Sequence, residues 1–128
     1  MTKRNVTPVF DDRDNVFTIS GANGKDEGLE FICSLDKRAQ ARFQFMLRKL
    51  SDGHHLKSPE HMRHLSSNDP EHRGAHVHEL KVSLGPGWRL YVVQWNGSWY
   101  VTHGLRKPKD NKVPQQIARA FETFHVDL

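Results

Sequence analysis

The sequence predicts a single α+β domain in which a β-sheet is backed by helices. In the first half of the chain the apolar residues recur at helical spacings, whereas further on they alternate with polar residues as in strands. The pair Asn96-Gly97 separates two of these strand-like segments and is a strong hairpin signal. A length of 128 residues fits one domain, residues 1–128, with one modest core.

A long N-terminal helix is the clearest predicted element. Its apolar residues recur at spacings of three and four and therefore lie on one stripe: Leu29, Ile32, Leu35, Ala39, Phe43, Met46 and Leu50. Acidic residues near its start and basic residues near its end complement the helix dipole, and Gly53 is expected to end it. The single cysteine, Cys33, excludes an intramolecular disulfide and is expected to be a small core residue.

Strands are predicted on both sides of this helix. Short β-prone runs at 6–10 and 16–20, joined by a polar turn, predict one or two strands. Ser58-Pro59 is expected to open a short helix, which a polar loop at 66–75 follows. Alternation then predicts strands around Leu80, over 88–95 and over 99–103. A short C-terminal helix opens at Pro114, and its apolar face comprises Ile117, Ala120, Phe121 and Phe124.

A two-residue turn at Asn96-Gly97 fixes the register of the hairpin. Trp95 then pairs with Ser98, Val92 faces Val101, and Leu90 lies opposite His103, on a face suited to packing under the long helix. The other face carries Lys81, Arg89, Tyr91, Val93, Tyr100 and Thr102. A cationic sheet surface with aromatic rings suits RNA, because phosphates take the charges and unstacked bases lie on rings. An ordinary solvated sheet face would carry the same residue types.

Composition narrows the function classes only in part. The formal net charge of +4 and the pI near 9.4 favour an anionic partner, such as nucleic acid or an acidic protein, although many basic proteins bind neither. No signal peptide and no membrane-length apolar stretch are recognisable, so we expect a cytoplasmic protein. His61 with His64, and His76 with His78, have the spacing of metal-ligand pairs, but no acidic ligand stands at a recognisable spacing. We therefore expect no metal and mostly solvated histidines.

Five segments, taken in order, resemble a known toxin family. They lie at 29–35 (Leu-Glu-Phe-Ile-Cys-Ser-Leu), 78–82 (His-Glu-Leu-Lys-Val), 87–91 (Gly-Trp-Arg-Leu-Tyr), 102–107 (Thr-His-Gly-Leu-Arg-Lys) and 113–114 (Val-Pro). The series is similar to the RelE/ParE superfamily and, within it, to the HigB-like branch of phage-derived toxins. The resemblance covers residues 27–124, whereas residues 1–26 form a divergent N-terminal segment.

This resemblance implies a fold and a function. The fold is a twisted, mostly antiparallel sheet of about four strands, backed by helices, with a basic concave face left open. The implied function is that of a type II toxin, a ribosome-dependent mRNA endoribonuclease that needs no cofactor and stops translation. Its partners would be mRNA, the ribosome and a small helix-turn-helix antitoxin. A ParE-like toxin of DNA gyrase and an inactive binding protein of the same fold are the alternatives.

The resemblance also assigns residues. Arg89 matches the arginine tied to the scissile phosphate, Lys81 matches a basic strand residue of the family site, and Lys107 matches the first of two lysines. Trp88 replaces the usual tyrosine, and Pro108 stands where the second lysine is expected. Because family members differ in the residue that handles the proton, that role does not carry over.

The chemistry of RNA cleavage extends this list. Attack by the 2′-OH requires a base, an acid for the leaving 5′-oxygen, and cations around the phosphate. Arg89 can clamp the phosphate, Lys81 and Lys107 add charge, and a lysine pKa should fall in such a site. Tyr91 could stack on a base or carry a proton, and His103 has the best-placed unperturbed pKa. Further RNA contacts are expected from Tyr100, Arg106, Lys109 and Lys112.

Overall fold

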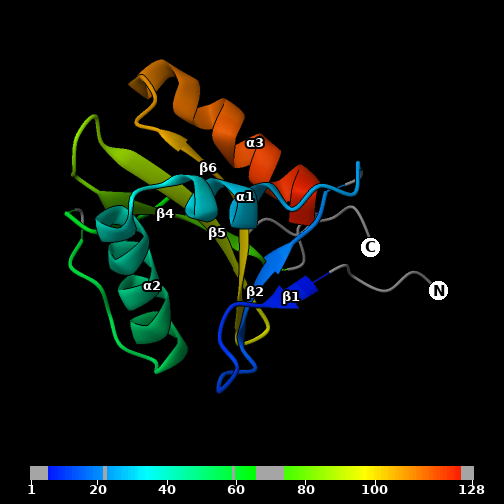
Figure 1. The fold of residues 1–128 in the computed structure, drawn as a ribbon. Coiled ribbons are helices and arrows are strands. Elements are labelled where there is room, and N and C mark those ends of the chain that lie inside the picture. Colours follow the sequence, from blue (N-terminus) through cyan, green and yellow to red (C-terminus); the bar gives the residue numbers. More distant parts are fainter. Residues whose placement is uncertain (1–5, 22, 59, 66–73, 125–128) are drawn as a thin grey trace.

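The computed structural model describes residues 6–21, 23–58, 60–65 and 74–124, so most of the loop expected at 66–75 lies outside the described residues. Figure 1 shows the elements in chain order. They are β1 (Val6–Pro8), β2 (Val16–Ile19), α1 (Glu27–Ser34), α2 (Lys37–Ser51), β3 (Met62–His64), β4 (His76–Val82), β5 (Trp88–Trp95), β6 (Ser98–Arg106), the 3-10 turn η2 (Asp110–Lys112) and α3 (Val113–Phe124).

The predicted α+β class is confirmed, with a larger sheet than expected. The six-stranded sheet has the order β1-β2-β6-β5-β4-β3, and its strand pairs are antiparallel except for the parallel pair β2–β6. Both N-terminal runs form strands, which extend the sheet at one edge. At the other edge, Met62 pairs with Leu80 and His64 with His78, so the short helix predicted after Ser58 is a strand instead. Pro59 itself lies outside the described residues.

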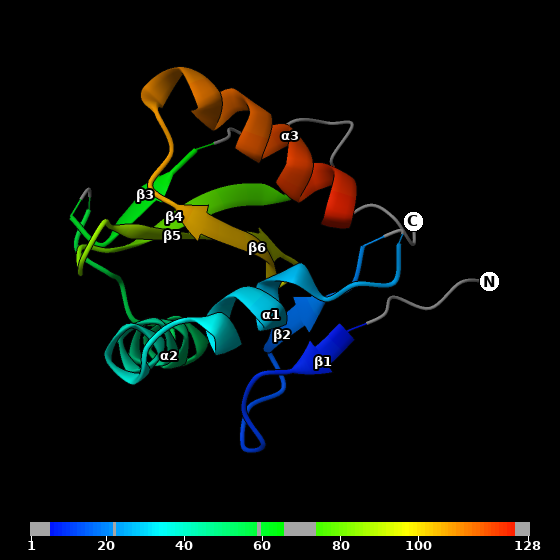
Figure 2. The same cartoon turned by 45° about the horizontal axis from the view of Figure 1, so that its top comes forward.

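Helices cover both faces of the sheet. Figure 2 shows α1 and α2 on one face and α3 on the other. The α2 face buries one apolar cluster, which includes Phe43, Leu47 and Leu90, and the α3 face buries a second cluster around Phe121 and Phe124. The resemblance implied an open concave face, but the apolar side of α3 packs onto this face of the sheet, against β4, β5 and β6.

The predicted long helix is two helices with one continuous apolar stripe. The break lies at Leu35 and Asp36, which have extended backbone conformations. The Asp36 carboxylate accepts a hydrogen bond from the Ala39 amide (2.8 Å), as an N-cap residue does. The stripe residues from Ile32 onwards, including Leu35, are all buried in one apolar cluster. Leu29 and Cys33, which were expected in the core, are exposed.

The predicted hairpin register is confirmed near the turn and fails further along. Trp95 pairs with Ser98 and Val92 with Val101, and Asn96 and Gly97 have positive φ angles of 53° and 81°. A β-bulge beyond Val92 then shifts the register, so that Tyr91 pairs with His103. His103 consequently lies on the α3 face with Tyr91, and not opposite Leu90 on the α2 face.

Candidate functional site

A small cavity at the end of the sheet next to the start of α3 brings predicted site residues together. Its volume is about 140 Å³, and we call it the basic pocket. It is lined by Arg63, Glu79, Lys81, Arg89, Lys107, Pro108, Asp110 and Val113. Three of the five predicted catalytic residues, Lys81, Arg89 and Lys107, therefore share one site.

Strand pairing and a glycine turn place these three cations. Lys81 and Arg89 are direct partners across β4 and β5. Beyond the end of β6, the Lys107 amide donates a hydrogen bond to the Gly87 carbonyl (3.0 Å). Gly87 has a φ of 87°, a left-handed conformation that glycine adopts readily, so glycine suits this turn.

Glu79 is a central residue of this pocket, although it was not among the site residues predicted from the sequence. Its side chain is only 2% exposed. Its Oε1 lies 3.5 Å from Arg63 Nη2 and 3.7 Å from Arg89 Nε, and its Oε2 accepts a 2.7 Å hydrogen bond from the Tyr91 hydroxyl. The signal that could have identified Glu79 is its place two residues before Lys81, on the same strand face. No such signal existed for Arg63, because its segment was predicted to be helical.

The charge balance of the pocket is positive. Four cationic side chains and two carboxylates line it. Desolvation by burial, and then the charge of Arg63, lower the pKa of Lys81, in the direction expected for a lysine among cations. Arg89 is 7% exposed and donates a hydrogen bond to the Trp88 carbonyl (3.1 Å), so its guanidinium is held in place. The cations of the pocket therefore have the charge to bind a small anion.

Comparison with protein families identifies the chain. Residues 30–124 match the family of phage-derived Gp49-like proteins (DUF891). The chain belongs to the Gp49-like family. This family is RelE-like, which confirms the predicted resemblance at the level of the superfamily. The matched segment includes every residue of the basic pocket. No curated protein and no solved structure matches the chain.

In this Gp49-like protein, Tyr91 and His103 lie buried beside the basic pocket rather than in it. Tyr91 is fully buried and its ring stacks on His103 (4.8 Å between centroids), so stacking on an RNA base is excluded in this conformation. Burial and the hydrogen bond to Glu79 raise the pKa of Tyr91. His103 is 1% exposed, and its ring nitrogens lie 3.0 Å from Thr102 Oγ1 and 3.0 Å from Gln116 Oε1. Burial, and then the charge of Arg119, lower the pKa of His103 to about 4, so its ring is neutral near pH 7.

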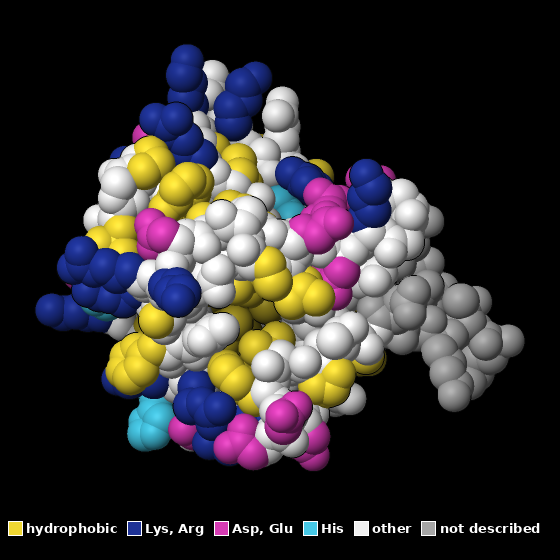
Figure 3. Space-filling model, viewed as in Figure 1, with side chains coloured by type: hydrophobic (Ala, Val, Ile, Leu, Met, Phe, Trp, Pro, Cys, Tyr) yellow, Lys and Arg dark blue, Asp and Glu magenta, His cyan; other side chains and the backbone are white. Residues whose placement is uncertain are grey.

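The four predicted RNA-binding residues are divided between two places. Tyr100 lies near the hairpin turn, far along β6 from the pocket, and packs between Phe17 and Phe124 (5.6 and 5.3 Å between centroids). Arg106, Lys109 and Lys112 are exposed at the end of β6 and before α3. Figure 3 shows Lys and Arg side chains gathered at this end of the molecule, at the top of the view. Their binding to RNA stays a prediction.

Pro108 places an apolar ring in the wall of the pocket, at the position where the family pattern has a second lysine. Lys109, the next cation along the chain, is exposed and does not line the cavity. The fourth cation that lines the basic pocket is therefore Arg63, from the edge strand, in addition to the three predicted ones.

The two histidine pairs with metal-ligand spacing, His61 with His64 and His76 with His78, have no third ligand within the part of the chain that the structure describes. Within the described residues, no group of three or more His, Cys, Asp or Glu side chains is placed to hold a metal ion. The described helices also include none that is long and apolar enough to cross a membrane.

Proposed function

We propose that this Gp49-like protein is the toxin of a type II toxin–antitoxin pair, of the HigB-like kind, and acts as a ribosome-dependent mRNA endoribonuclease. The observation that supports this most is the convergence of Lys81, Arg89 and Lys107 around the carboxylate of Glu79 in one pocket. Its partners would be mRNA, ribosomal RNA and a small helix-turn-helix antitoxin.

The basic pocket has the size and charge to hold one phosphodiester group. Arginine offers paired N–H donors in a fork that fits phosphate oxygens, and lysine adds a compact charge. Arg89 is the fixed member, because burial and its bond to the Trp88 carbonyl restrict it. Lys107 is exposed and can close over a bound strand. The start of α3 borders the cavity at Val113, where the helix dipole also favours negative charge.

The proposed reaction is transesterification within the RNA. The 2′-oxygen attacks the adjacent phosphorus while the bond from phosphorus to the 5′-oxygen breaks, which leaves a 2′,3′-cyclic phosphate and a 5′-hydroxyl. Glu79 Oε1 accepts the proton of the 2′-OH, since Oε2 is engaged by Tyr91. Lys81 donates a proton to the leaving 5′-oxygen, and its lowered pKa favours that donation. Arg89 and Lys107 stabilise the negative charge that grows on the phosphate oxygens.

The test is to express the protein in bacteria and map new RNA 5′ ends across the transcriptome. Lys81→Met removes the proposed acid from a half-buried site, and Lys37→Ala is a matched control, because Lys37 is exposed at the start of α2. We expect growth arrest and new mRNA ends in a fixed reading-frame phase for the wild type and for Lys37→Ala. In Lys81→Met these ends should fall by about 100-fold or more.

Each other outcome contradicts the proposal in a defined way. Growth arrest without new RNA ends would contradict the nuclease function and favour a ParE-like toxin of DNA gyrase. Inhibition of gyrase by the purified protein would then test that alternative. The absence of arrest with folded wild-type protein would indicate a binding protein without activity, and would direct attention to Pro108.

A further inference from the structure

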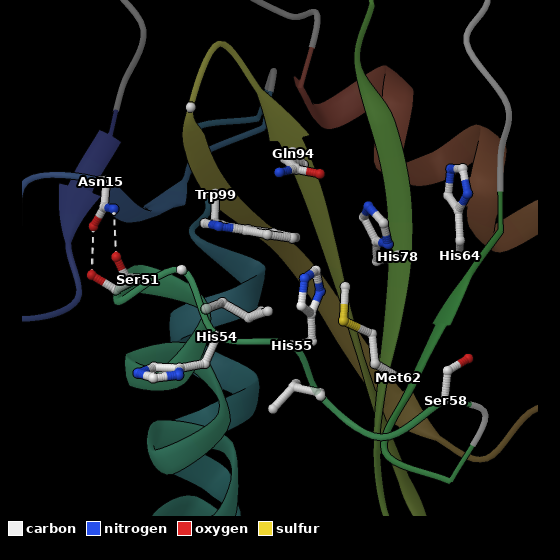
Figure 4. Close-up of a pocket in the computed structure, with 14 residues that line it drawn as sticks. Asn15, Ser51, His54, His55, Ser58, Met62, His64, His78, Gln94 and Trp99 are labelled. Carbon is white, nitrogen blue, oxygen red and sulfur yellow. Dashed lines mark hydrogen bonds between the residues drawn. The ribbon is translucent and has the colours of Figure 1, made fainter.

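A second, larger cavity lies on the opposite face of the sheet from the basic pocket. Its volume is about 500 Å³, and we call it the histidine pocket. Figure 4 shows that it lies between the end of α2, the segment that follows this helix, the strands β3 and β4, and the hairpin. The side chains that matter here are His55, His64, His78, Gln94 and Trp99. Since Met62 and His64 line this cavity while Arg63 lines the basic pocket, β3 separates the two.

His78 is the residue that indicates a ligand. It is 9% exposed, and neither of its ring nitrogens has a hydrogen-bond partner within the described residues. Gln94 is close enough to favour a protonated His78 ring but makes no hydrogen bond of good geometry with it. Buried polar atoms without partners are rare because they lose hydrogen bonds to water and gain nothing in return. A ligand that binds beside His78 would supply the missing partner.

Several aromatic rings line the histidine pocket. The His64 and His78 rings are stacked, with 4.7 Å between centroids and 24° between planes. The Trp99 indole lies 5.3 Å from the His78 ring. In Figure 4 the ring of His55 lies between those of Trp99 and His78 in the view, so that these rings line the same hollow. Such a surface favours a flat ligand with a π-face of its own.

The histidine pocket differs from the basic pocket in the kinds of side chain that line it. None of the described residues that line it is Lys, Arg, Asp or Glu. Burial, and then the charges of His64 and His76, lower the pKa of His78 to about 4, so its ring is neutral at pH 7. A neutral imidazole offers one donor and one acceptor, and the Gln94 amide offers both as well. These groups match a neutral ligand with donors and acceptors on one edge, and they do not match a free phosphate.

We propose that the histidine pocket binds a nucleobase, stacked against Trp99 and the histidine rings and hydrogen-bonded through its edge to His78 and Gln94. A cavity of this volume lies in the range of small-ligand sites. The base could be supplied by a free nucleoside or by an unstacked nucleotide of an RNA strand that crosses β3. The proposal does not depend on the nuclease activity, because the two cavities share no lining residue.

The experiment is a titration of the full chain with each of four ribonucleosides, with a short RNA, and with the same RNA containing one abasic position. Binding is followed by NMR of the histidine ring and tryptophan indole nitrogens. His78→Phe keeps a ring of similar size without its nitrogens, and His61→Ala is the control, because His61 is exposed and lines a different cavity. We expect a dissociation constant raised about tenfold or more in His78→Phe and unchanged in His61→Ala.

The comparison between ligands identifies the source of the base. Binding of nucleosides supports a free ligand, whereas binding of the intact RNA but not of the abasic RNA supports a base within a strand. Gln94→Leu replaces a half-buried side chain and serves as the second variant if His78→Phe fails to fold. The proposal would be overturned if His78→Phe and Gln94→Leu bound the ligands as tightly as the wild type does. It would also be overturned if the NMR signals of the wild type responded to none of these ligands, or responded to Zn²⁺ alone. Lys81→Met should bind the nucleobase normally even if it abolishes RNA cleavage.

Discussion

Glu79 is the buried charge on which both the stability and the chemistry of the basic pocket depend. It compensates Arg89, which is almost as buried, and it fixes the hydroxyl of Tyr91. A buried ion pair contributes little net stability but is costly to break, because one charge is then left without a partner. Substitution of Glu79 or Arg89 would therefore confuse loss of folding with loss of function. Lys81 is the better residue for testing activity, since it is only half-buried.

Tyr91→Phe separates a structural role from a catalytic one. The change removes the hydrogen bond to Glu79 Oε2 and leaves a buried acceptor unsatisfied, so we expect a loss of about 1–3 kcal/mol in the free energy of unfolding. Urea denaturation measures this loss, and an unchanged m-value shows that the same surface is still buried. RNA cleavage by the folded variant should persist, because the Tyr91 side chain is fully buried. Loss of cleavage at full folding would give Tyr91 a role in proton transfer.

Two buried histidines make stability depend on pH. The pKa values of His78 and His103 fall from 6.5 to about 4 in the folded protein. Well above pH 6.5 the two histidines are neutral in both the folded and the unfolded protein. As the pH is lowered from 6.5 to 4, they take up protons mainly in the unfolded chain, so the free energy of unfolding decreases as the pH decreases. The loss is about 3 kcal/mol for each histidine by pH 4.

Thermal unfolding between pH 8 and pH 4 measures this dependence. His103→Gln should flatten its part of the curve, whereas His54→Gln, which changes an exposed histidine, should not. An unchanged pH profile in His103→Gln would mean that the ring is protonated in the folded state.

At the level of the elements, periodicity predicted which segments are regular but not where they deviate. The apolar stripe through Phe43 and Leu50 continues across the break at Asp36, because α1 and α2 pack on the same cluster. The stripe alone therefore predicts one helix. The N-cap at Asp36 was visible in the sequence only as one acidic residue among several.

The β-bulge could not be predicted from the alternation of apolar and polar residues, because that pattern assumes a strand register without interruptions. It moves His103 to the face of Tyr91, where the Thr102 hydroxyl donates a hydrogen bond to the Tyr91 carbonyl (3.3 Å). Three of the predicted site residues still lie together in the basic pocket, since Lys81 and Arg89 lie in the regular part of the sheet and Lys107 follows its last strand. Arg63 could not be predicted as a site residue, because β3 has only three residues, too few to show the alternation of a strand.

The contact between α1 and β6 depends on a glycine. A Cβ at Gly104 would clash with the ring of Phe31, which packs edge-on against Phe43 and Trp88. We expect Gly104→Ala to cost about 1–3 kcal/mol, as other overpacked sites do. Gly21→Ala is the control, because the nearest atom to its new Cβ is 3.6 Å away, and it should stay within about 0.5 kcal/mol of the wild type. Equal effects of the two substitutions in chemical denaturation would contradict this packing.

For the whole molecule, the exposed cations at the start of α3 predict how binding responds to salt. If Lys109 and Lys112 contact RNA phosphates, changing both to Ala should reduce the salt dependence of binding by about 1–2 units of slope in log K against log salt. Affinity for single-stranded RNA, measured over a range of KCl concentrations, tests this. Lys37→Ala should leave the slope unchanged, and an unchanged slope in the double variant would show that these lysines do not contact phosphates.

Because β2 pairs with β6, the sheet cannot be completed until late in the synthesis of the protein. Val16 pairs with Trp99, and 83 positions separate the two along the chain. At about 5–20 residues per second, the ribosome takes roughly 4–17 s after β2 to synthesise β6, the second partner of β2 in the sheet. The N-terminal hairpin is therefore an unprotected strand pair for most of translation. A nascent chain released before β6 is made lacks both Lys107 and the strand that joins β2 to β5, so only a nearly full-length product can carry the proposed activity.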